Sequence, residues 1–207
     1  SGPAGLNAAL TAAKKGKDVI LVEQDFELGG DSINESSSES KEKLSCLVLA
    51  VQKASVRIMT RTTAFGLYDN GTAGLLERVT DHLAEPSRCQ PRQRFWIVRS
   101  EATILATGAL ERSIAFENND RPGVMTVAAA RTYLNRFGIL PGQRIVIATN
   151  NDSAYTTATD LSNAGADVVL VDIRSSSSVA VSSGVTVKHG VAPLKALGGR
   201  FVTGVIL

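Results

Sequence analysis

Side chains that commonly carry redox and metal chemistry are scarce in this sequence. Its 207 residues include two cysteines and two histidines. Cys46 and Cys89 stand alone, without the CxxC or CxxxxC spacing of a redox disulphide or a metal site. Their isolation argues against both kinds of site and favours a reducing, cytoplasmic compartment. We interpret His82 as a surface residue of a strand rather than a catalytic base, and we expect His189 to lie exposed in a turn.

Long apolar runs and a strong charge of one sign are also missing. The apolar run at residues 168–171 is far too short for a membrane span, and no charged-then-apolar leader opens the chain. We therefore expect no membrane association, while a targeting segment upstream of Ser1 stays an open question. The formal net charge is +2 and the basic residues are dispersed, which argues against nucleic acid as a partner. The length suffices for one large or two small domains.

What is present is a glycine pattern at the very start. Gly2 and Gly5 have the spacing of the second and third glycines of G-x-G-x-x-G, with Pro3 between them. The second glycine lets the backbone approach a pyrophosphate, and the third lets the following helix pack on its strand. An apolar helical pattern begins at Leu6. We expect the first glycine and the first strand of this motif to lie upstream of Ser1.

Two later features support a dinucleotide site. An apolar strand ends in Glu23, at the distance from Gly2 where a carboxylate usually binds ribose hydroxyls. Residues 102–107 resemble a buried strand that ends in an Ala-Thr-Gly turn. A glycine pair at Gly29 and Gly30 would let a loop pass close to the nucleotide, although an ordinary turn is equally consistent. An ordinary strand-turn-helix is the alternative to the whole pattern, and we favour cofactor binding. The predicted site comprises Gly2, Pro3, Gly5, Glu23, Gln24, Gly30, Ala106, Thr107 and Gly108; we predict no catalytic and no metal-binding residue.

The remaining first part of the chain contains three further segments. Residues 34–43 are polar and lack apolar periodicity, so we expect an exposed loop or a disordered insertion. Residues 44–51 have helical spacing. Residues 62–98 read as an antiparallel meander, with strands predicted at residues 64–68, 75–83 and 95–98 and a turn signal at Asp69-Asn70-Gly71.

A second Rossmann-like unit follows. We expect helices at residues 126–135 and 153–164 and strands at residues 144–149 and 167–172. The turn before the second helix has no glycine, and Asp152 there would repel a phosphate while capping the helix. Asp172 holds the ribose-binding position, but without glycines upstream we interpret it as an ordinary strand-end carboxylate. We interpret this unit as structural or subunit-facing, with an unusual ligand as the alternative.

After a serine-rich linker, short strands at residues 185–187, 193–197 and 201–206 are predicted to return toward the first domain. The predicted domains are residues 1–120, 121–180 and 181–207. The fold class is α/β, with two interleaved Rossmann-like dinucleotide-binding domains of the glutathione-reductase-like FAD/NAD(P)-binding type and an inserted antiparallel β-meander.

Residues 108–125 form the most distinctive stretch of the sequence. Together with residues 60–66, 131–138 and 149–155 they closely resemble the alpha subunit of heterotetrameric sarcosine oxidase. The resemblance covers nearly the whole chain and is weakest at residues 34–43. This chain lacks the family's first strand and its carboxy-terminal folate-binding domain.

The resemblance implies a division of labour. In that family NAD is bound by the alpha subunit, FAD by the beta subunit and FMN at their interface, with gamma and delta subunits completing the heterotetramer. Sarcosine is oxidised on the beta subunit, and tetrahydrofolate receives the one-carbon unit. No residue of this chain would then perform the amine oxidation, and the isolated chain is expected to be inactive. Two alternatives stay open: the nucleotide-binding subunit of a related dye-linked, proline-type amino-acid dehydrogenase, and a scaffold module without a ligand.

Overall fold

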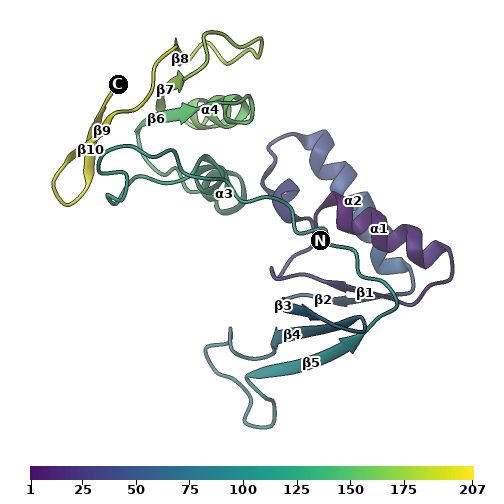
Figure 1. The fold of residues 1–207 in the computed structure, drawn as a ribbon. Coiled ribbons are helices and arrows are strands. Elements are labelled where there is room, and N and C mark those ends of the chain that lie inside the picture. The colour runs from purple at the N-terminus through teal and green to yellow at the C-terminus, as the bar shows by residue number, and fades with distance from the viewer. The chain divides into compact units, whose positions relative to one another are not determined.

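The computed structural model describes residues 1–207, and contacts within the chain divide it into two compact units, Ser1–Ala109 and Leu110–Leu207. Each unit combines helices with a small parallel sheet (Figure 1). Unit 1 also contains an antiparallel meander, and unit 2 an antiparallel hairpin. The predicted α/β class with an inserted meander is confirmed. The predicted domain boundaries at 120/121 and 180/181 stay predictions.

The parallel sheet of unit 1 consists of β1 (Val19–Val22) and β2 (Val56–Met59), paired along their full lengths. Helices α1 (Pro3–Lys14) and α2 (Ser38–Lys53) pack beside each other and contact these strands (Figure 1). Apolar residues at helical spacing give each helix one inward face. The buried side chains that join helices and sheet are Leu6, Ala9, Leu21 and Val51. This core fixes where α1 begins relative to the end of β1.

Helix α2 corrects the loop predicted at residues 34–43, because the helix has already begun inside this polar tract. Ser37 is its N-cap, and the serine hydroxyl accepts a hydrogen bond from the Ser40 N–H at 3.4 Å. Lys43 pairs with Glu39 one turn earlier at 2.6 Å. These polar interactions stabilise the first turns of α2, which contain no apolar residue. Hydrophobic periodicity therefore identified only the second half of α2.

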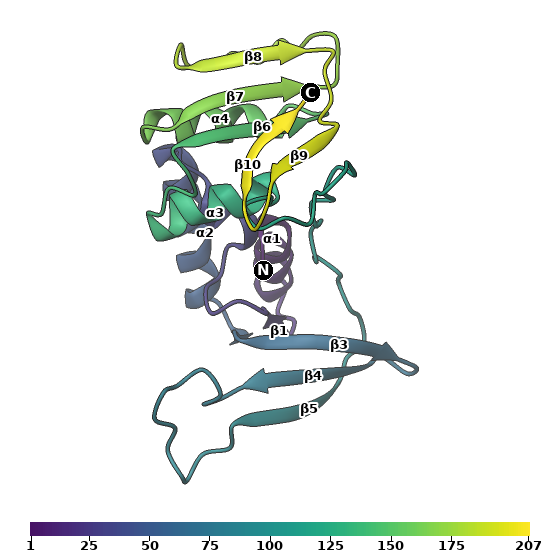
Figure 2. The ribbon, with the colours of Figure 1, turned by 90° about the vertical axis from the view of Figure 1, so that its left-hand side faces the viewer.

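The meander contains β3 (Thr62–Tyr68), β4 (Thr72–Arg78) and β5 (Gln93–Arg99), paired antiparallel in that order (Figure 2). The β3–β4 turn uses the positive φ angles of Asn70, at 57°, and Gly71, at 65°. The meander and its turn are therefore confirmed. The second strand ends at Arg78 rather than at residue 83, because the next two N–H groups both donate to the carbonyl of Arg92 and the ladder stops.

Residues 102–107 do not form the predicted buried strand. The side chains of Ile104 and Leu105 are 68% and 69% exposed. A strand is held by hydrogen bonds to a neighbouring strand, and β1 pairs with β2 alone. Without a strand beside them, residues 102–107 form an irregular segment. The strand predicted from this apolar run is therefore wrong.

In unit 2 a parallel sheet has the order β6 (Arg144–Thr149), β7 (Asp167–Asp172) and β8 (Val185–His189). Helix α4 (Ser153–Asn163) packs on this sheet and also contacts α3 (Val127–Phe137). The bounds of β6 and β7 match the prediction, and both helices match within two residues. The core includes Tyr155, Ala158, Leu161, Val168 and Leu170.

The strand at residues 185–187 is a correction. It was predicted to return toward the first domain, but β8 pairs in parallel with β7, Val168 facing Val185. Val168 and Val185 are both β-branched and apolar, and together they extend the face of the sheet that packs on α4. The strand therefore belongs to the sheet of unit 2. The sequence pattern identified this strand but not the strand with which it pairs.

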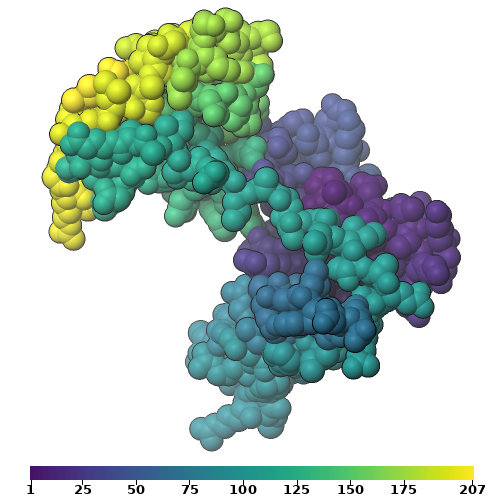
Figure 3. All heavy atoms as spheres, viewed as in Figure 1, coloured from purple at the N-terminus to yellow at the C-terminus, as the bar shows by residue number.

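The last two strands, β9 (Lys195–Gly198) and β10 (Val202–Ile206), form an antiparallel hairpin. The hairpin is attached to the segment that precedes α3: Glu117 forms a bridge with Lys195, and their side chains pair at 2.6 Å. The hairpin (yellow) and this segment (teal) lie together in the space-filling view (Figure 3). Both strands were predicted, within two residues at each end.

None of the helices combines the length and the apolar composition that crossing a membrane requires.

Candidate nucleotide-binding site

The start of α1 has the features of an anion-binding helix end. Gly2 is the N-cap residue, with extended backbone (φ −63°, ψ −178°), and Pro3 occupies the first helical position. No side chain caps this end of the helix, and the first turn contains no acidic residue. The backbone N–H groups of a helix start carry partial positive charge and bind phosphates well. Gly2 and Pro3 therefore build the kind of helix start that a pyrophosphate needs.

A second loop crosses directly over this helix start. The 3-10 helix η1 (Gly30–Asn34) begins at Gly30, which has φ 55°. A Cβ atom on Gly30 would lie 2.8 Å from the Cα atom of Gly2, a distance that real Cβ atoms do not adopt. The N–H of Gly29 donates to the carbonyl of Ser1 at 3.1 Å, which ties the two loops together. Glycine is therefore required at residue 30 both by φ and by the contact with Gly2.

Gly5 provides the third close approach. A Cβ atom on Gly5 would lie 3.3 Å from the Cβ atom of Ala106 and 4.0 Å from Cδ1 of Leu21. The helix thus lies close to both β1 and the first residue of the Ala-Thr-Gly turn, which is the packing role expected of the third glycine. Thr107 and Gly108 follow Ala106 directly but are exposed. Gly108 has φ 70°, and its neighbourhood is open.

Glu23 lies at the carboxyl end of β1, beside the helix start. Its carboxylate accepts hydrogen bonds from the amino group of Ser1 and from the N–H of Asp25, the latter at 2.8 Å. Partial burial acts to raise the pKa of Glu23, but these donors together outweigh it and lower the pKa. Glu23 is therefore ionised at neutral pH and can accept hydrogen bonds from ribose hydroxyls. Gln24 next to it is exposed, and its carbonyl accepts from Arg78 at 3.3 Å.

The structure thus gathers most of the predicted residues but not all of them. Gly2, Pro3, Gly30 and Glu23 surround one helix start, and Gly5 contacts Ala106. No close contact joins Thr107, Gly108 or the Gln24 side chain to this group. Asp25 was not among the predicted site residues. Its backbone N–H orients the Glu23 carboxylate, a contact that does not depend on the side chain and that the sequence therefore did not signal.

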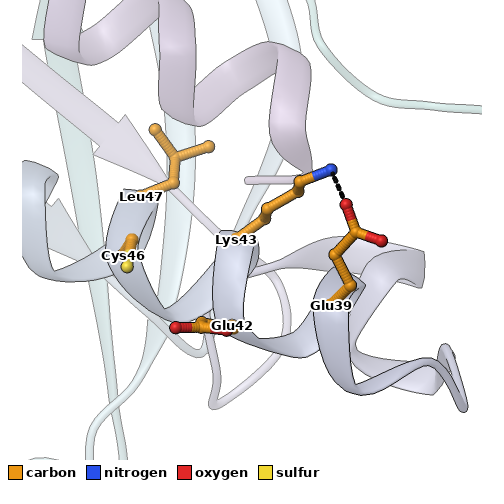
Figure 4. A pocket seen from close by; sticks show the side chains of 5 residues that line it. All are labelled: Glu39, Glu42, Lys43, Cys46 and Leu47. Atoms are coloured by element: carbon orange, nitrogen blue, oxygen red, sulfur yellow. Dashed lines mark hydrogen bonds and ion pairs between the residues drawn. The ribbon is translucent and has the colours of Figure 1, made fainter.

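The histidines and cysteines are not part of this site. His82 is exposed, but it lies in a turn beyond β4 rather than on the predicted strand. His189 is exposed as predicted, but it is the last residue of β8 rather than part of a turn. Cys46 and Cys89 are both free and exposed. Cys46 helps to line a hollow on α2 (Figure 4), but all the lining residues come from one helix and Lys43 there is paired with Glu39. The hollow offers no converging polar groups from other elements.

The equivalent end of the sheet in unit 2 is filled by a polar network. Asp172, completely buried at the end of β7, accepts hydrogen bonds from the Tyr155 hydroxyl at 2.8 Å and from Arg174 Nη2 at 2.7 Å. The Arg174 guanidinium is the main reason why the pKa of Asp172 is well below its usual range. Burial and the hydrogen bond to Asp172 raise the pKa of Tyr155. The signal for this network was an arginine two residues after the strand-end aspartate.

Asp152 is a correction. It occupies the N-cap position of α4 but makes no capping hydrogen bond. Its carboxylate instead accepts from Arg174 Nη2 at 2.6 Å and from the Ser177 hydroxyl at 3.0 Å. The Asn151 side chain takes over the capping role, accepting from the Ser153 N–H at 3.0 Å. A guanidinium within reach forms a stronger hydrogen bond with a carboxylate than a backbone N–H does.

Two α/β units with a glycine-lined helix start define a nucleotide-binding oxidoreductase fold. A family model described as pyridine nucleotide-disulphide oxidoreductase matches residues 1–189. The chain belongs to this family. It is 41% identical over 185 residues to sarcosine oxidase subunit alpha of Rhizobium meliloti (strain 1021), a match that covers 86% of this chain and 19% of that protein. The resemblance to sarcosine oxidase alpha subunits is thus confirmed.

Two further comparisons agree. The chain is 39% identical over 203 residues to sarcosine oxidase subunit alpha of Corynebacterium sp. (strain U-96), covering 92% of this chain and 21% of that protein. It therefore spans about a fifth of the length of these curated relatives. The solved structure of L-proline dehydrogenase from P. horikoshii superposes with a TM-score of 0.74 at 23% identity, covering 99% of this chain and 37% of that one. That likeness shows the fold alone.

Proposed function

We propose that this chain is the NAD-binding part of the alpha subunit of a sarcosine oxidase complex. The supporting observation is the glycine cradle of unit 1, where Gly30 meets Gly2 and an uncapped helix start lies beside Glu23. Its chemistry fits a dinucleotide: helix N–H groups suit the pyrophosphate, and an ionised carboxylate suits the ribose. The confirmed similarity to sarcosine oxidase alpha subunits supports the choice of complex.

The complex would oxidise sarcosine to glycine with formation of hydrogen peroxide, and would pass the one-carbon unit to tetrahydrofolate. Flavins supply the redox chemistry: FAD on the beta subunit and FMN at its interface with this subunit, with gamma and delta subunits completing a cytoplasmic heterotetramer. The part of the chain described here binds and orients the dinucleotide through Gly2, Pro3, Gly5 and Glu23. The site would be completed by Gly30, Gln24 and the turn formed by Ala106, Thr107 and Gly108.

A second candidate is the nucleotide-binding subunit of a dye-linked amino-acid dehydrogenase. The superposition on L-proline dehydrogenase shows a shared fold, which is compatible with both candidates. In both candidates unit 1 binds a dinucleotide and the amine is oxidised elsewhere. They differ in the amine and in the electron acceptor.

The test is to purify the longest natural form of this chain with its partner subunits and to identify the released nucleotide by mass spectrometry. One equivalent of NAD is expected per chain, and a Gly5→Val variant should lose it, because the added methyl groups would meet Ala106 and Leu21. Gly199→Ala is a matched control, since a Cβ atom there meets nothing within 4 Å. Full nucleotide content in a folded Gly5→Val variant contradicts the assignment. Sarcosine-dependent peroxide formation separates the first candidate from proline-dependent dye reduction.

A further inference from the structure

The second unit has its own positions for a dinucleotide, and its side chains occupy them. In a Rossmann unit the pyrophosphate lies at the start of the helix that follows the first strand, and the carboxylate that ends the second strand binds ribose. In unit 2 these positions are the start of α4 and Asp172. Asp172 is completely buried, so its carboxylate is closed to solvent and to a ligand.

The hydrogen-bonding capacity of Asp172 is used within the chain. The Tyr155 hydroxyl donates to it at 2.8 Å and the Arg174 N–H at 2.9 Å. The Arg174 guanidinium adds bonds of 2.7 Å from Nη2 and of 3.1 and 3.2 Å from Nε. A ribose could bind only by displacing a charge-assisted pair from a buried position, which is costly.

The phosphate position is blocked as well. Arg174 Nη2 also donates to Asp152 at 2.6 Å, so that one guanidinium joins the ribose position to the helix start. The Asp152 carboxylate places negative charge where phosphates would lie. The Asn151 side chain accepts from the Ser153 N–H, the first backbone donor of α4, at 3.0 Å and from the Ser153 hydroxyl at 2.6 Å.

We propose that unit 2 is a closed nucleotide slot, filled by Asp152, Asp172 and Arg174, and that it binds neither NAD(H) nor NADP(H). The matched family model spans both units, so the family alone does not distinguish which of them takes a nucleotide. With this slot closed, unit 1 is the candidate dinucleotide site among these residues. The inference does not depend on the proposed function, because unit 2 is closed whatever unit 1 binds.

Hydrogen–deuterium exchange of the longest natural chain, stripped of nucleotide, tests the proposal without any mutation. Saturating NAD, NADH, NADP or NADPH should leave exchange at residues 149–155 and 172–177 unchanged. Slower exchange in those residues with any of the four would overturn the closed slot. Slower exchange at residues 2–30 would report nucleotide binding to unit 1. Unchanged exchange in those residues would contradict the proposed function but not this inference.

Calorimetric titration with NADH and NADPH gives a second readout. The wild type should bind at most one equivalent, Gly5→Val should bind none, and Asp152→Asn should match the wild type in stoichiometry and affinity. Asp152 is half exposed, so this variant tests the slot with little risk to folding. Nucleotide binding by Gly5→Val that Asp152→Asn alters contradicts the proposal.

Discussion

Gly5, in the first turn of α1, lies so close to Ala106 that a methyl group on Gly5 would be 3.3 Å from the Ala106 Cβ atom. This contact brings the first residue of the Ala-Thr-Gly turn to the helix start, although residues 102–107 form no strand. Gly2 and Gly30 make the corresponding contact on the other loop. Two pairs of residues far apart in the chain therefore shape one site.

Gly2→Ala separates ligand sterics from folding. The backbone of Gly2 suits any residue, and a Cβ atom there meets nothing within 4 Å, so the variant should fold with unchanged thermal stability. A pyrophosphate at the helix start would meet the new methyl group, and NAD affinity should fall by roughly tenfold or more. Calorimetry on the longest natural chain measures this, with Gly199→Ala as control. Unchanged affinity would place the phosphates elsewhere.

Glu23 should select NAD over NADP. A glutamate carboxylate is charged at neutral pH, so it accepts hydrogen bonds from a free ribose and repels a 2'-phosphate. In competition between the two nucleotides, NAD should bind more tightly than NADP. Glu23→Gln should reduce NAD affinity by roughly tenfold and should make the affinities for NAD and NADP more similar. Asp18→Asn, which removes an exposed carboxylate at the start of β1, should change neither. Tighter binding of NADP to the wild type would refute this role.

Tyr155→Phe should destabilise unit 2 without affecting nucleotide binding. The substitution removes the 2.8 Å hydrogen bond to the buried Asp172 carboxylate and keeps the aromatic ring in the core. A hydrogen bond to a charged group is worth about 1.5–3 kcal/mol, so the free energy of unfolding should fall by that amount. Chemical denaturation measures it, and Tyr133→Phe, on the surface of α3, should have no comparable effect. Equal stability of both variants would show that the hydroxyl contributes nothing.

Asp172 should make stability depend on pH in the acid range. Its pKa is lower in the folded chain than in the unfolded chain, mainly because of Arg174, so the folded state binds fewer protons. The stabilisation is complete above the unfolded pKa of about 3.9 and declines as the pH falls from there toward the folded pKa. Asp172→Asn should therefore be less stable than the wild type at pH 7, with the difference shrinking below about pH 4. A difference independent of pH would exclude this ionisation as the cause.

The isolated 207-residue chain should not oxidise sarcosine. Both histidines and both cysteines are exposed and lie outside the candidate site, and the proposed function places the oxidation of the amine on flavins of the complex. With sarcosine, FAD, FMN and NAD supplied, hydrogen peroxide and reduced nicotinamide should stay at the level of a blank without protein. The longest natural chain co-expressed with its partners should produce peroxide. Sustained turnover by the 207-residue chain alone would mean that the chemistry has been assigned to the wrong subunit.

The sequence by itself determined the elements with clear local patterns. Strands β6 and β7 were predicted to the residue because continuous apolar runs stand between turn signals, and Asn70-Gly71 fixed the β3–β4 turn. The spacing of Gly2, Gly5 and Glu23 indicated a nucleotide site before any geometry was known. These signals are local, and period and turn chemistry are enough to recognise them.

The tertiary structure alone decided which segments meet. Residues 102–107 lack a partner strand however apolar they are. Asp152 looked like a helix cap, yet Arg174 reaches it from the end of β7 and Asn151 caps the helix instead. In each case hydrogen-bond partners compete, and the outcome depends on distances that only folding sets.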